Sequence, residues 1–222
     1  MQIQKVNNNY NRSNSITFQK ILRNNIPAEA IKDNHYLLLV SGPSGVGKNT
    51  IMDKLLHRFN QVVTCTTRAK REDEVEGVSY FFLTLEKFLE GVKNNEFIEY
   101  IKGFSGNYYG TKKETIQNAM NGEKPALLIV DVDGAKKIKN RLKDSSGINV
   151  VSVFIKPPSA KVLEKRLSGR GTENAIAIQE RLARSNYEMR QAKFFDAVIR
   201  NNDCESSVRD SVRDFEELLH LK

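Results

Sequence analysis

The sequence has only two cysteines, only three histidines and no long hydrophobic run. No apolar stretch approaches the roughly 18–20 residues that a membrane-spanning helix needs, so a soluble protein is expected. Cys65 and Cys204 lie far apart in the sequence, which matches neither a metal-ligand spacing nor a redox pair. We therefore expect ordinary thiols in a reducing, cytoplasmic compartment, and a disulfide-stapled module is excluded.

Positive charge is what the sequence has in excess. Thirty-five lysines and arginines oppose 27 acidic residues, so the formal net charge is +8. This balance favours an anionic partner, which could be a nucleotide, a nucleic acid or an acidic membrane surface. The 222 residues, 39% of them hydrophobic, suffice for one large domain or for a core with an inserted subdomain.

Residues 1–35 differ in composition from the rest of the chain. They are rich in asparagine and basic, and no acidic residue precedes Glu29. Such a segment buries little apolar surface, so we expect a flexible or loosely docked extension with one short amphipathic turn around residues 16–22. The acid-poor start also has a weak similarity to an organellar transit peptide, whereas a secretory signal is excluded because an apolar segment is missing.

From Tyr36 onward, short apolar runs alternate with longer segments of helical period. That alternation predicts an α/β fold with three layers, α/β/α, around a mostly parallel sheet. The expected strands are Tyr36–Val40, Val62–Thr66, Ala126–Val130, Val150–Ile155 and Ala197–Ile199. The expected helices are Thr50–Phe59, Leu85–Lys93, Thr111–Asn121, Ala135–Leu142, Ala160–Leu167, Ala175–Lys193 and Ser206–Leu221.

Two segments interrupt this alternation. Residues 62–110 place β-favouring pieces around one helix and are interpreted as a small inserted subdomain. Residues 168–184 are rich in arginine and glycine and poor in large apolar residues, which indicates a mobile lid. The core of the domain, which runs from 36 to 222, would then consist of residues 36–61, 111–167 and 185–222.

The most specific motif follows the first expected strand. It reads, in order, Gly42, Pro43, Ser44, Gly45, Val46, Gly47, Lys48, Asn49 and Thr50. This is the G-x-x-x-x-G-K pattern of a P-loop, placed between a strand and a helix. Its glycines let successive backbone N–H groups turn toward one anion, and Lys48 places a positive charge near the β- and γ-phosphates. The motif predicts a site for a nucleoside triphosphate.

One residue of the motif departs from its usual form. The serine or threonine that normally follows the lysine, and whose hydroxyl meets Mg²⁺, is replaced by Asn49. An amide oxygen also ligates hard cations, directly or through water, so Mg²⁺ is still expected with the triphosphate. Asn49 and, one residue later, Thr50 are its candidate ligands on the loop.

A basic cluster and two aromatic segments follow along the chain. Arg68, Lys70 and Arg71 fall within four residues at the end of an expected strand. Guanidinium groups suit phosphate oxygens, but clustered basic residues are as often a solvated face. The tyrosines of the segments 77–82 and 106–111 could donate to phosphate or stack on a base, although packing is the commoner role of such residues.

Taken together, the motifs resemble the guanylate kinase family. Besides the P-loop, those that occur in family order are T-T-R-x-x-R, G-x-x-Y-x-F, F-I-E, G-N-Y-Y-G, D-x-x-x-G, P-P-S, G-R-G-T-E and V-I-x-N-x-D. They span roughly residues 36 to 220. The resemblance implies Mg²⁺-dependent transfer of a phosphoryl group from ATP to GMP or dGMP, with residues 62–110 as the GMP-binding subdomain.

The resemblance also implies a role for each matching residue. The acceptor-phosphate clamp corresponds to Arg68, Arg71, Tyr80 and Tyr109, and the guanine-reading set to Thr64, Glu99 and Thr111. Gly110 is a further GMP-binding position. Asp131 corresponds to the acid near the acceptor and the metal, which it would meet directly or through water. Arg166, Arg170 and Arg181 fall where the family's arginines reach the transferring phosphoryl group, and Asn201 falls near the donor base. Lys48, Arg68, Arg170 and Arg181 are expected to act in catalysis.

Several positions depart from the family pattern. Thr64 and Cys65 replace common serines, Lys70 stands where proline is frequent, Asp133 sits near a usual glutamine, and Ile129 replaces a second aspartate. We still expect activity, because the P-loop lysine, the arginine pair and the guanine-reading acid are present.

Elementary chemistry agrees with the role assigned to Glu99. The Watson–Crick edge of guanine offers two adjacent donors, N1–H and the N2 amine, and a carboxylate accepts both. Adenine lacks that pair, so a buried carboxylate facing it would lose its partners, and such sites discriminate by about 10⁴ or more. No catalytic base is required, because the attacking phosphate oxygen of GMP has a second pKa of about 6 and is largely ionised at neutral pH.

Two other functions stay open. A guanylate-kinase-like module that binds proteins and has lost phosphoryl transfer is the first alternative, although such modules generally lack a working P-loop. Nucleic-acid binding through the net charge is the second, and it is disfavoured because no RNA-binding signature accompanies the charge. ATP and GMP are the expected partners, without a membrane, and the protein is expected to be a monomer or a homodimer.

Overall fold

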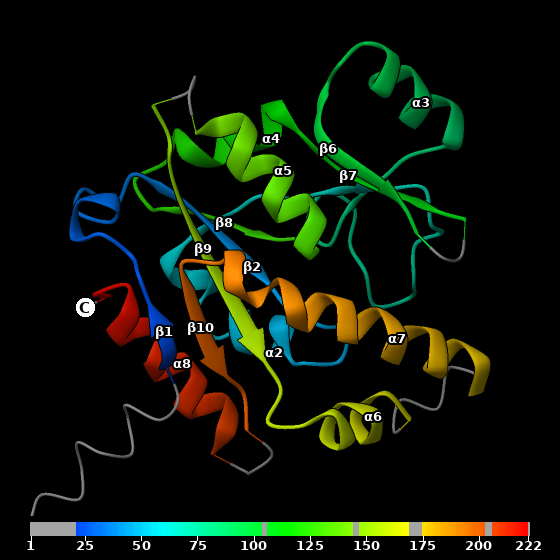
Figure 1. Cartoon of the computed structure of the whole chain (residues 1–222). Helices are drawn as coiled ribbons and strands as arrows, with labels where there is room; N and C mark the ends of the chain where they lie inside the picture. The colour runs from blue at the N-terminus through cyan, green and yellow to red at the C-terminus, as the bar shows by residue number, and fades with distance from the viewer. Residues whose placement is uncertain (1–20, 104–105, 144–146, 169–174, 203–205, 222) are drawn as a thin grey trace, which may run out of the picture.

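The computed structural model describes residues 21–103, 106–143, 147–168, 175–202 and 206–221. Its centre is a six-stranded sheet with the order β1-β10-β9-β2-β8-β3, in which every pair is parallel except β1 with β10 (Figure 1). The strands are β1 (Ile21–Asn24), β2 (Tyr36–Ser41), β3 (Asn60–Gln61), β8 (Ala126–Ile129), β9 (Asn149–Lys156) and β10 (Ala197–Arg200).

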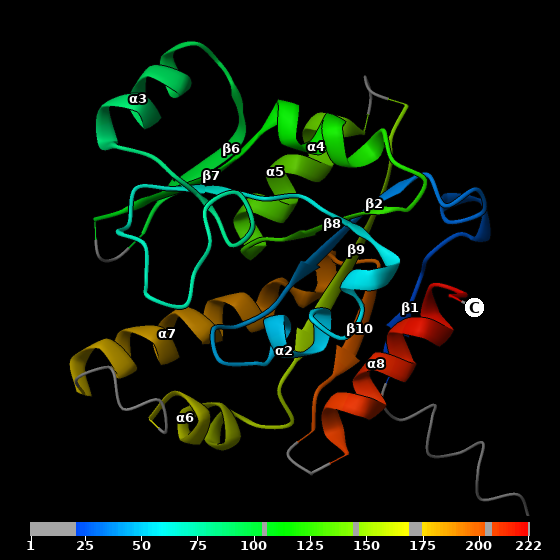
Figure 2. The same cartoon turned by 180° about the vertical axis from the view of Figure 1, so that it is seen from behind.

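Helices cover both faces of this sheet, as the two opposite views show (Figures 1 and 2). One face packs against α2 (Lys48–Met52) and α8 (Ser207–Leu218), and the other against α4 (Lys113–Met120), α5 (Val132–Leu142) and α7 (Ala175–Gln191). β2 lies between them with all six of its residues buried, as is typical of a parallel strand covered on both sides. The predicted three-layer α/β/α fold is confirmed.

A second, smaller sheet stands beside the main one. Its order is β5-β4-β7-β6, with β4 (Cys65–Thr66), β5 (Phe81–Phe82), β6 (Phe97–Lys102) and β7 (Tyr108–Lys112). Helix α3 (Leu85–Lys93) closes it, and Phe88 stacks on Phe97 with ring centroids 4.4 Å apart above the buried thiol of Cys65. This sheet therefore has a small hydrophobic core of its own.

The predicted strand Val62–Thr66 is wrong, because the chain changes sheets within it. Asn60 and Gln61 pair with β8 of the main sheet, whereas Cys65 and Thr66 pair with β5 and β7 of the second sheet. The apolar run that indicated one strand is a crossing between two sheets. The last hydrogen bond to the main sheet comes from the Val62 N–H to the Leu127 carbonyl at 2.8 Å.

The N-terminal extension, expected to be flexible up to residue 35, joins the fold earlier. Residues 21–24 form the edge strand β1, and the turn η1 (Ala28–Ala30) leads to Ile31, which is buried in the main core. Edge pairing with β10 near the other end of the chain is a long-range interaction, which local composition does not reveal. Residues 1–20 lie outside the described part of the chain.

The helix expected after the P-loop, Thr50–Phe59, is shorter than predicted. The α-helix ends at Met52, and the chain continues in tighter turns through η2 (Leu56–Arg58), with bonds from the N–H of Leu55 to Met52 and from Arg58 to Leu55, each 2.8 Å long. Leu55 and Phe59 remain buried in this geometry.

The remaining elements are α6 (Ala160–Ser168) and η3 (Ala192–Phe194). Among the described residues, no helix combines the length and apolarity needed to cross a membrane.

Candidate functional site

The site lies at the carboxyl ends of the parallel strands. The glycine-rich loop follows β2, Asp131 follows β8, and Asn201 follows β10. In open α/β sheets this edge is where ligands bind, because the connections leaving neighbouring strands diverge there. Three of the motifs that the sequence analysis singled out are thus placed at one end of the main sheet.

The glycine-rich loop has a backbone that only glycine adopts without strain. Gly42, Gly45 and Gly47 all have positive φ values, of 149°, 81° and 95°. A Cβ on Gly42 would lie 2.3 Å from the Ile155 carbonyl oxygen, and one on Gly47 would lie 2.6 Å from the amide nitrogen of Asn201. At Gly42 and Gly47 the loop therefore packs too closely against its neighbours for a side chain, which fits the glycines that the motif requires.

Asn201 holds the loop from β10. Its side chain is buried, and its amide nitrogen donates to the Val46 carbonyl at 2.7 Å. The Ser211 hydroxyl, on α8, lies 3.4 Å from the Asn201 side-chain oxygen. The Asn201 amide therefore stabilises the loop. The family resemblance implies a different role for this residue, near the donor base.

Three cationic side chains surround the loop. Lys48 folds back onto it and donates to the Gly42 carbonyl at 2.7 Å and the Pro43 carbonyl at 3.1 Å. Arg181, on α7, donates to the Ser44 hydroxyl at 3.0 Å. Arg166, on α6, donates to the Asn202 carbonyl at 2.8 Å. Charges from three different elements therefore meet where the sequence predicts phosphates.

A second cationic group belongs to the smaller sheet. Arg68 makes a two-pronged contact with Glu74, with distances of 2.6 and 3.0 Å, and its guanidinium lies 5.6 Å from the centroid of the Tyr80 ring. The Tyr80 and Tyr109 rings meet edge to face, with centroids 6.3 Å apart. Burial raises the pKa of Tyr80, so its phenol stays a hydrogen-bond donor at neutral pH. Arg68, Tyr80 and Tyr109 are brought together, as predicted for one phosphate.

Glu99 is a buried acid on β6, only 5% exposed. It faces Thr111 of β7 in the antiparallel register, and the Thr111 hydroxyl donates to its carboxylate at 2.6 Å. The other carboxylate oxygen lies close to the start of α5, where a Cβ on Gly134 would come within 3.1 Å of it. Glu99 is therefore held between the second sheet and the end of the main sheet that carries Asp131.

The environment of Glu99 changes its acidity. Burial raises the pKa of Glu99 to about 7, the Thr111 hydrogen bond opposes this shift, and the negative charge of Asp131 adds to it. A buried carboxyl group with a raised pKa is typical of a ligand-recognition or catalytic position. A ligand that offers two N–H donors would favour the ionised form.

The raised pKa predicts a pH-dependent cost to stability. Below pH 4.5 the carboxyl group is protonated in the folded and unfolded states alike, whereas between about 4.5 and 7 only the unfolded state loses its proton. Stability therefore falls as the pH rises through this window, by about 3 kcal/mol at most. We expect Glu99→Gln to be more stable than the wild type at pH 8 in urea unfolding, with the advantage absent at pH 4.5. The same difference at both pH values would contradict this assignment.

Asp131 caps α5 and offers one oxygen to a cation. Its Oδ1 accepts from the backbone N–H groups of Asp133 at 2.8 Å and Gly134 at 3.0 Å, while no hydrogen bond to Oδ2 occurs among the described residues. Asn49, on the first turn of α2, is exposed. No group of three or more histidine, cysteine, aspartate or glutamate side chains is arranged to hold a metal in the part of the chain that the structure describes.

The other predicted site residues have simple placements. Thr64 lies at the start of the second sheet, where its carbonyl accepts from the Phe81 N–H at 2.8 Å. Arg71 is exposed, and its backbone N–H donates to Glu74 at 2.9 Å. Thr50 is exposed beside Asn49, and Gly110 is buried opposite Tyr100 and Cys65. Arg170 and most of the first half of the expected lid lie outside the described residues.

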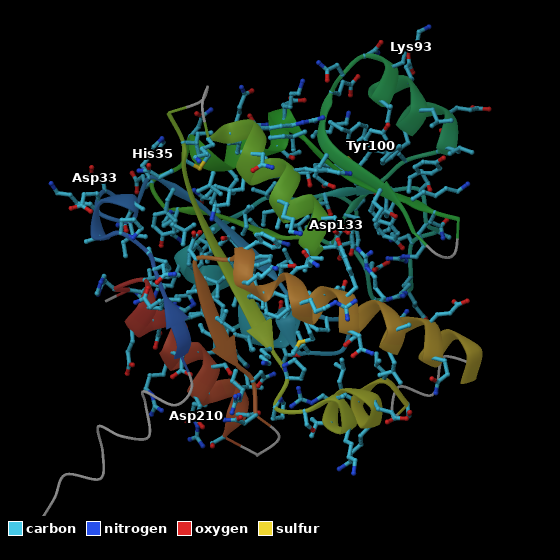
Figure 3. The ribbon with its side chains drawn as sticks, in the orientation of Figure 1. Asp33, His35, Lys93, Tyr100, Asp133 and Asp210 are labelled. Carbon is cyan, nitrogen blue, oxygen red and sulfur yellow. The ribbon has the colours of Figure 1, made fainter. Side chains whose placement is uncertain are left out.

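The sequence analysis missed a polar cluster between α5 and α7. Arg184 and Tyr187 of α7 both donate to Asp133, the residue that Figure 3 labels near the centre of the molecule, and Glu188 contacts Arg184. Asp133 was noted only as a departure from the family pattern. The spacing of Arg184 and Glu188, four residues apart on a helix, was the one local signal of this cluster.

Comparisons with known proteins agree with the motifs. A family model described as "Guanylate kinase" matches residues 34–218. The guanylate kinase of Prochlorococcus marinus subsp. pastoris is 37% identical over 186 residues, which cover 82% of this chain and 98% of that protein. The guanylate kinase of Rickettsia felis is 40% identical over 182 residues, covering 81% and 92%. A crystal structure of guanylate kinase from Anaplasma phagocytophilum matches with a TM-score of 0.64 at 30% identity, covering 83% of this chain and 84% of that one.

Proposed function

The chain belongs to the guanylate kinase family and is an ATP:GMP phosphotransferase, and from that premise we propose which of its residues bind each nucleotide and transfer the phosphoryl group. The observation that carries the assignment is the placement of a buried acid, Glu99, near the same end of the main sheet as the glycine loop and Lys48. An acid reads the acceptor base and a cationic loop holds the donor phosphates.

ATP binds with its phosphates on the glycine-rich loop. Backbone N–H groups of the glycine-rich loop surround the β-phosphate, and Lys48 leaves the Gly42 and Pro43 carbonyls to contact the β- and γ-phosphates. Arg181 and Arg166 already contact the loop or its neighbour and lie within reach of the same phosphates. Arg170 is assigned to this group from the family pattern alone.

GMP binds on the second sheet. Glu99 accepts the N1–H and N2 amine of guanine, supported by Thr111 and Thr64, while Asp131 lies close to Glu99. The GMP phosphate takes the fork of Arg68 together with the phenols of Tyr80 and Tyr109, and Arg71 and the close backbone of Gly110 complete this part of the site. In the structure the Glu74 carboxylate occupies the two donors of the Arg68 fork, and the GMP phosphate would take its place.

The transfer itself needs positioning and charge rather than a base. A phosphate oxygen of GMP attacks the γ-phosphorus of ATP, and ADP leaves. The acceptor oxygen is ionised at neutral pH, so no proton has to be removed. Lys48, Arg68, Arg181 and Arg170 neutralise the charge that two polyanions bring together, which supplies the main part of the rate enhancement.

Mg²⁺ enters with ATP, and the residues near the loop fit it. When bound, it would neutralise phosphate charge and hold the donor in line. Asp131, through its Oδ2 and by way of water, and the amide oxygen of Asn49 are the protein groups we assign to it.

The competing function is a protein-binding module without turnover. Coupled detection of ADP release with ATP, Mg²⁺ and GMP separates the two. Turnover that requires all three supports the kinase. A protein with a normal melting transition and no turnover would support the module.

The oligomeric state is tested on the same preparation by size-exclusion chromatography, for which we expect a monomer or a homodimer.

A further inference from the structure

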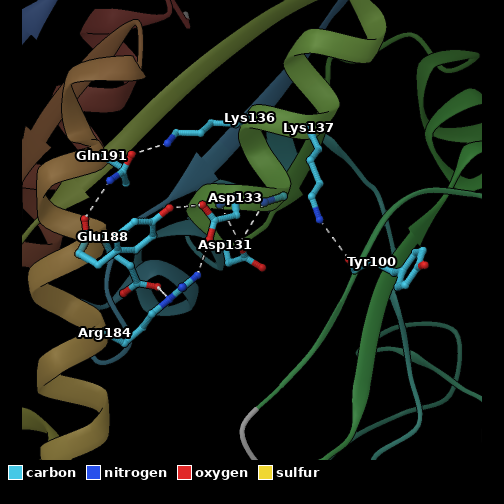
Figure 4. A network of polar contacts seen from close by, with 10 residues as sticks. Tyr100, Asp131, Asp133, Lys136, Lys137, Arg184, Glu188 and Gln191 are labelled. Carbon is cyan, nitrogen blue, oxygen red and sulfur yellow. Dashed lines mark hydrogen bonds and ion pairs between the residues drawn. The ribbon is translucent and has the colours of Figure 1, made fainter.

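Helices α5 and α7 are joined by a compact set of polar contacts (Figure 4). Each oxygen of the Asp133 carboxylate, on the first turn of α5, accepts from a different residue of α7. The Tyr187 hydroxyl donates to one oxygen at 2.6 Å, and the Arg184 guanidinium donates to the other at 2.7 Å. Although burial alone would raise the pKa of Asp133, these two hydrogen bonds lower it, so the carboxylate is ionised throughout the neutral range.

The cluster continues toward the glycine loop. Arg184 also lies 3.6 Å from Glu188, which is buried and close enough to Lys48 and Asp131 for their charges to affect it. Lys136, on α5, bonds Gln191 farther along α7. The charged groups that face Arg184 are therefore Asp133 of α5, Asp131 at the N-cap of α5, and Glu188 of α7 itself.

The cluster lies between the two halves of the proposed site. Arg181 precedes Arg184 by three residues, one turn of the same helix, and contacts Ser44 of the loop. Asp131 precedes Asp133 by two residues and lies beside Glu99, the proposed guanine-reading acid. A rotation or slip of α7 against α5 would change the distance between Arg181 and the acceptor site.

The geometry distinguishes this cluster from simple adhesion between helices. An ion pair of this kind contributes little net stability compared with apolar side chains of the same size, because both charges lose water. The cluster instead fixes the orientation of α7 relative to α5, because two donors from one helix bind both oxygens of one carboxylate. We propose that Asp133, Arg184 and Tyr187 are positioning residues that set α7 against α5, and so hold Arg181 over the glycine loop in register with the GMP site.

This inference rests on the role proposed for Arg181, and its test is a set of kinetic constants measured beside stability. We expect Asp133→Asn and Arg184→Gln each to lower kcat about tenfold, with the dissociation constant for GMP changed less than twofold. Tyr187→Phe should have a smaller effect in the same direction. The double variant of Asp133 and Arg184 should be no slower than the slower single variant, because both changes remove one contact.

A matched control comes from the other end of α5. Lys139 forms a 2.6 Å ion pair with Asp196, and the exposed fractions of these side chains, 31% and 24%, resemble the 28% and 30% of Arg184 and Asp133. Lys139→Met should lower the melting temperature and leave kcat unchanged.

The outcomes separate the inference from the role of Arg181. A kcat for Asp133→Asn that falls no more than that of Lys139→Met would overturn the inference, and Tyr187→Phe decides by the same criterion if Asp133→Asn does not fold. Full turnover by Arg181→Ala would instead remove the role of Arg181. Reduced turnover by Arg181→Ala with normal turnover by Asp133→Asn would remove the positioning inference alone.

Discussion

Replacing Lys48 with alanine is expected to lower kcat by at least about a hundredfold while the protein still folds. The Lys48 ammonium is the one cation of the glycine loop itself, and in the structure it contacts two carbonyls of that loop, Gly42 and Pro43. Its charge is needed most when the γ-phosphoryl group moves, because stabilisation of developing charge by one fixed donor contributes about 10²- to 10³-fold to rate. Steady-state kinetics with saturating GMP measures the effect.

Lys54 offers the matched control for this change. It is an exposed lysine just beyond the end of α2. Lys54→Ala should keep wild-type kcat, and both variants should melt close to the wild-type temperature. A Lys48→Ala enzyme that retains more than about a hundredth of wild-type turnover would remove Lys48 from the proposed mechanism.

Replacing Glu99 with glutamine is expected to lower kcat/KM for GMP by about 10³-fold and to leave ATP affinity within twofold of the wild type. The amide keeps the size of the carboxylate but presents an N–H₂ group to one of the two guanine donors, so one donor meets another and both lose their partner. Sites that read hydrogen bonds in this way discriminate strongly, because the mismatched polar groups stay buried and unpaired.

Glu96 provides the control on the same segment. It directly precedes β6 and forms an ion pair with Lys112 at 2.8 Å, whereas Glu99 bonds Thr111. Glu96→Gln should change neither nucleotide constant. Equal losses for GMP and ATP in Glu99→Gln would contradict a role in reading the base, since they would indicate general damage to the site.

Local motifs made the donor half of the site predictable. The glycine loop is encoded within nine consecutive residues, and its glycines have the positive φ values that such a turn requires. The acceptor half was less predictable, because Thr111 was expected to begin a helix, Thr111–Asn121, whereas it lies in β7 opposite Glu99 and α4 begins at Lys113. The assignments that came from the family pattern, such as Arg71 and Arg170, remain predictions.

The features that could not be predicted from the sequence depend on long-range contacts. The strand at residues 21–24 is recognisable only beside β10, far along the chain, so composition placed it in a flexible extension. The run Val62–Thr66 is apolar enough for one strand, yet it divides between two sheets whose separation depends on the whole fold. Asp133 meets Arg184 and Tyr187 only when α5 and α7 pack together, and a single sequence does not show that packing.

A crystal structure with GMP bound tests the central claim most directly. The account predicts the guanine N1–H and N2 amine within hydrogen-bond distance of the Glu99 carboxylate, and the phosphate in contact with Arg68, Tyr80 and Tyr109, facing the glycine loop. GMP bound with its base away from Glu99, or with its phosphate seated on the glycine loop in place of the donor, would contradict it.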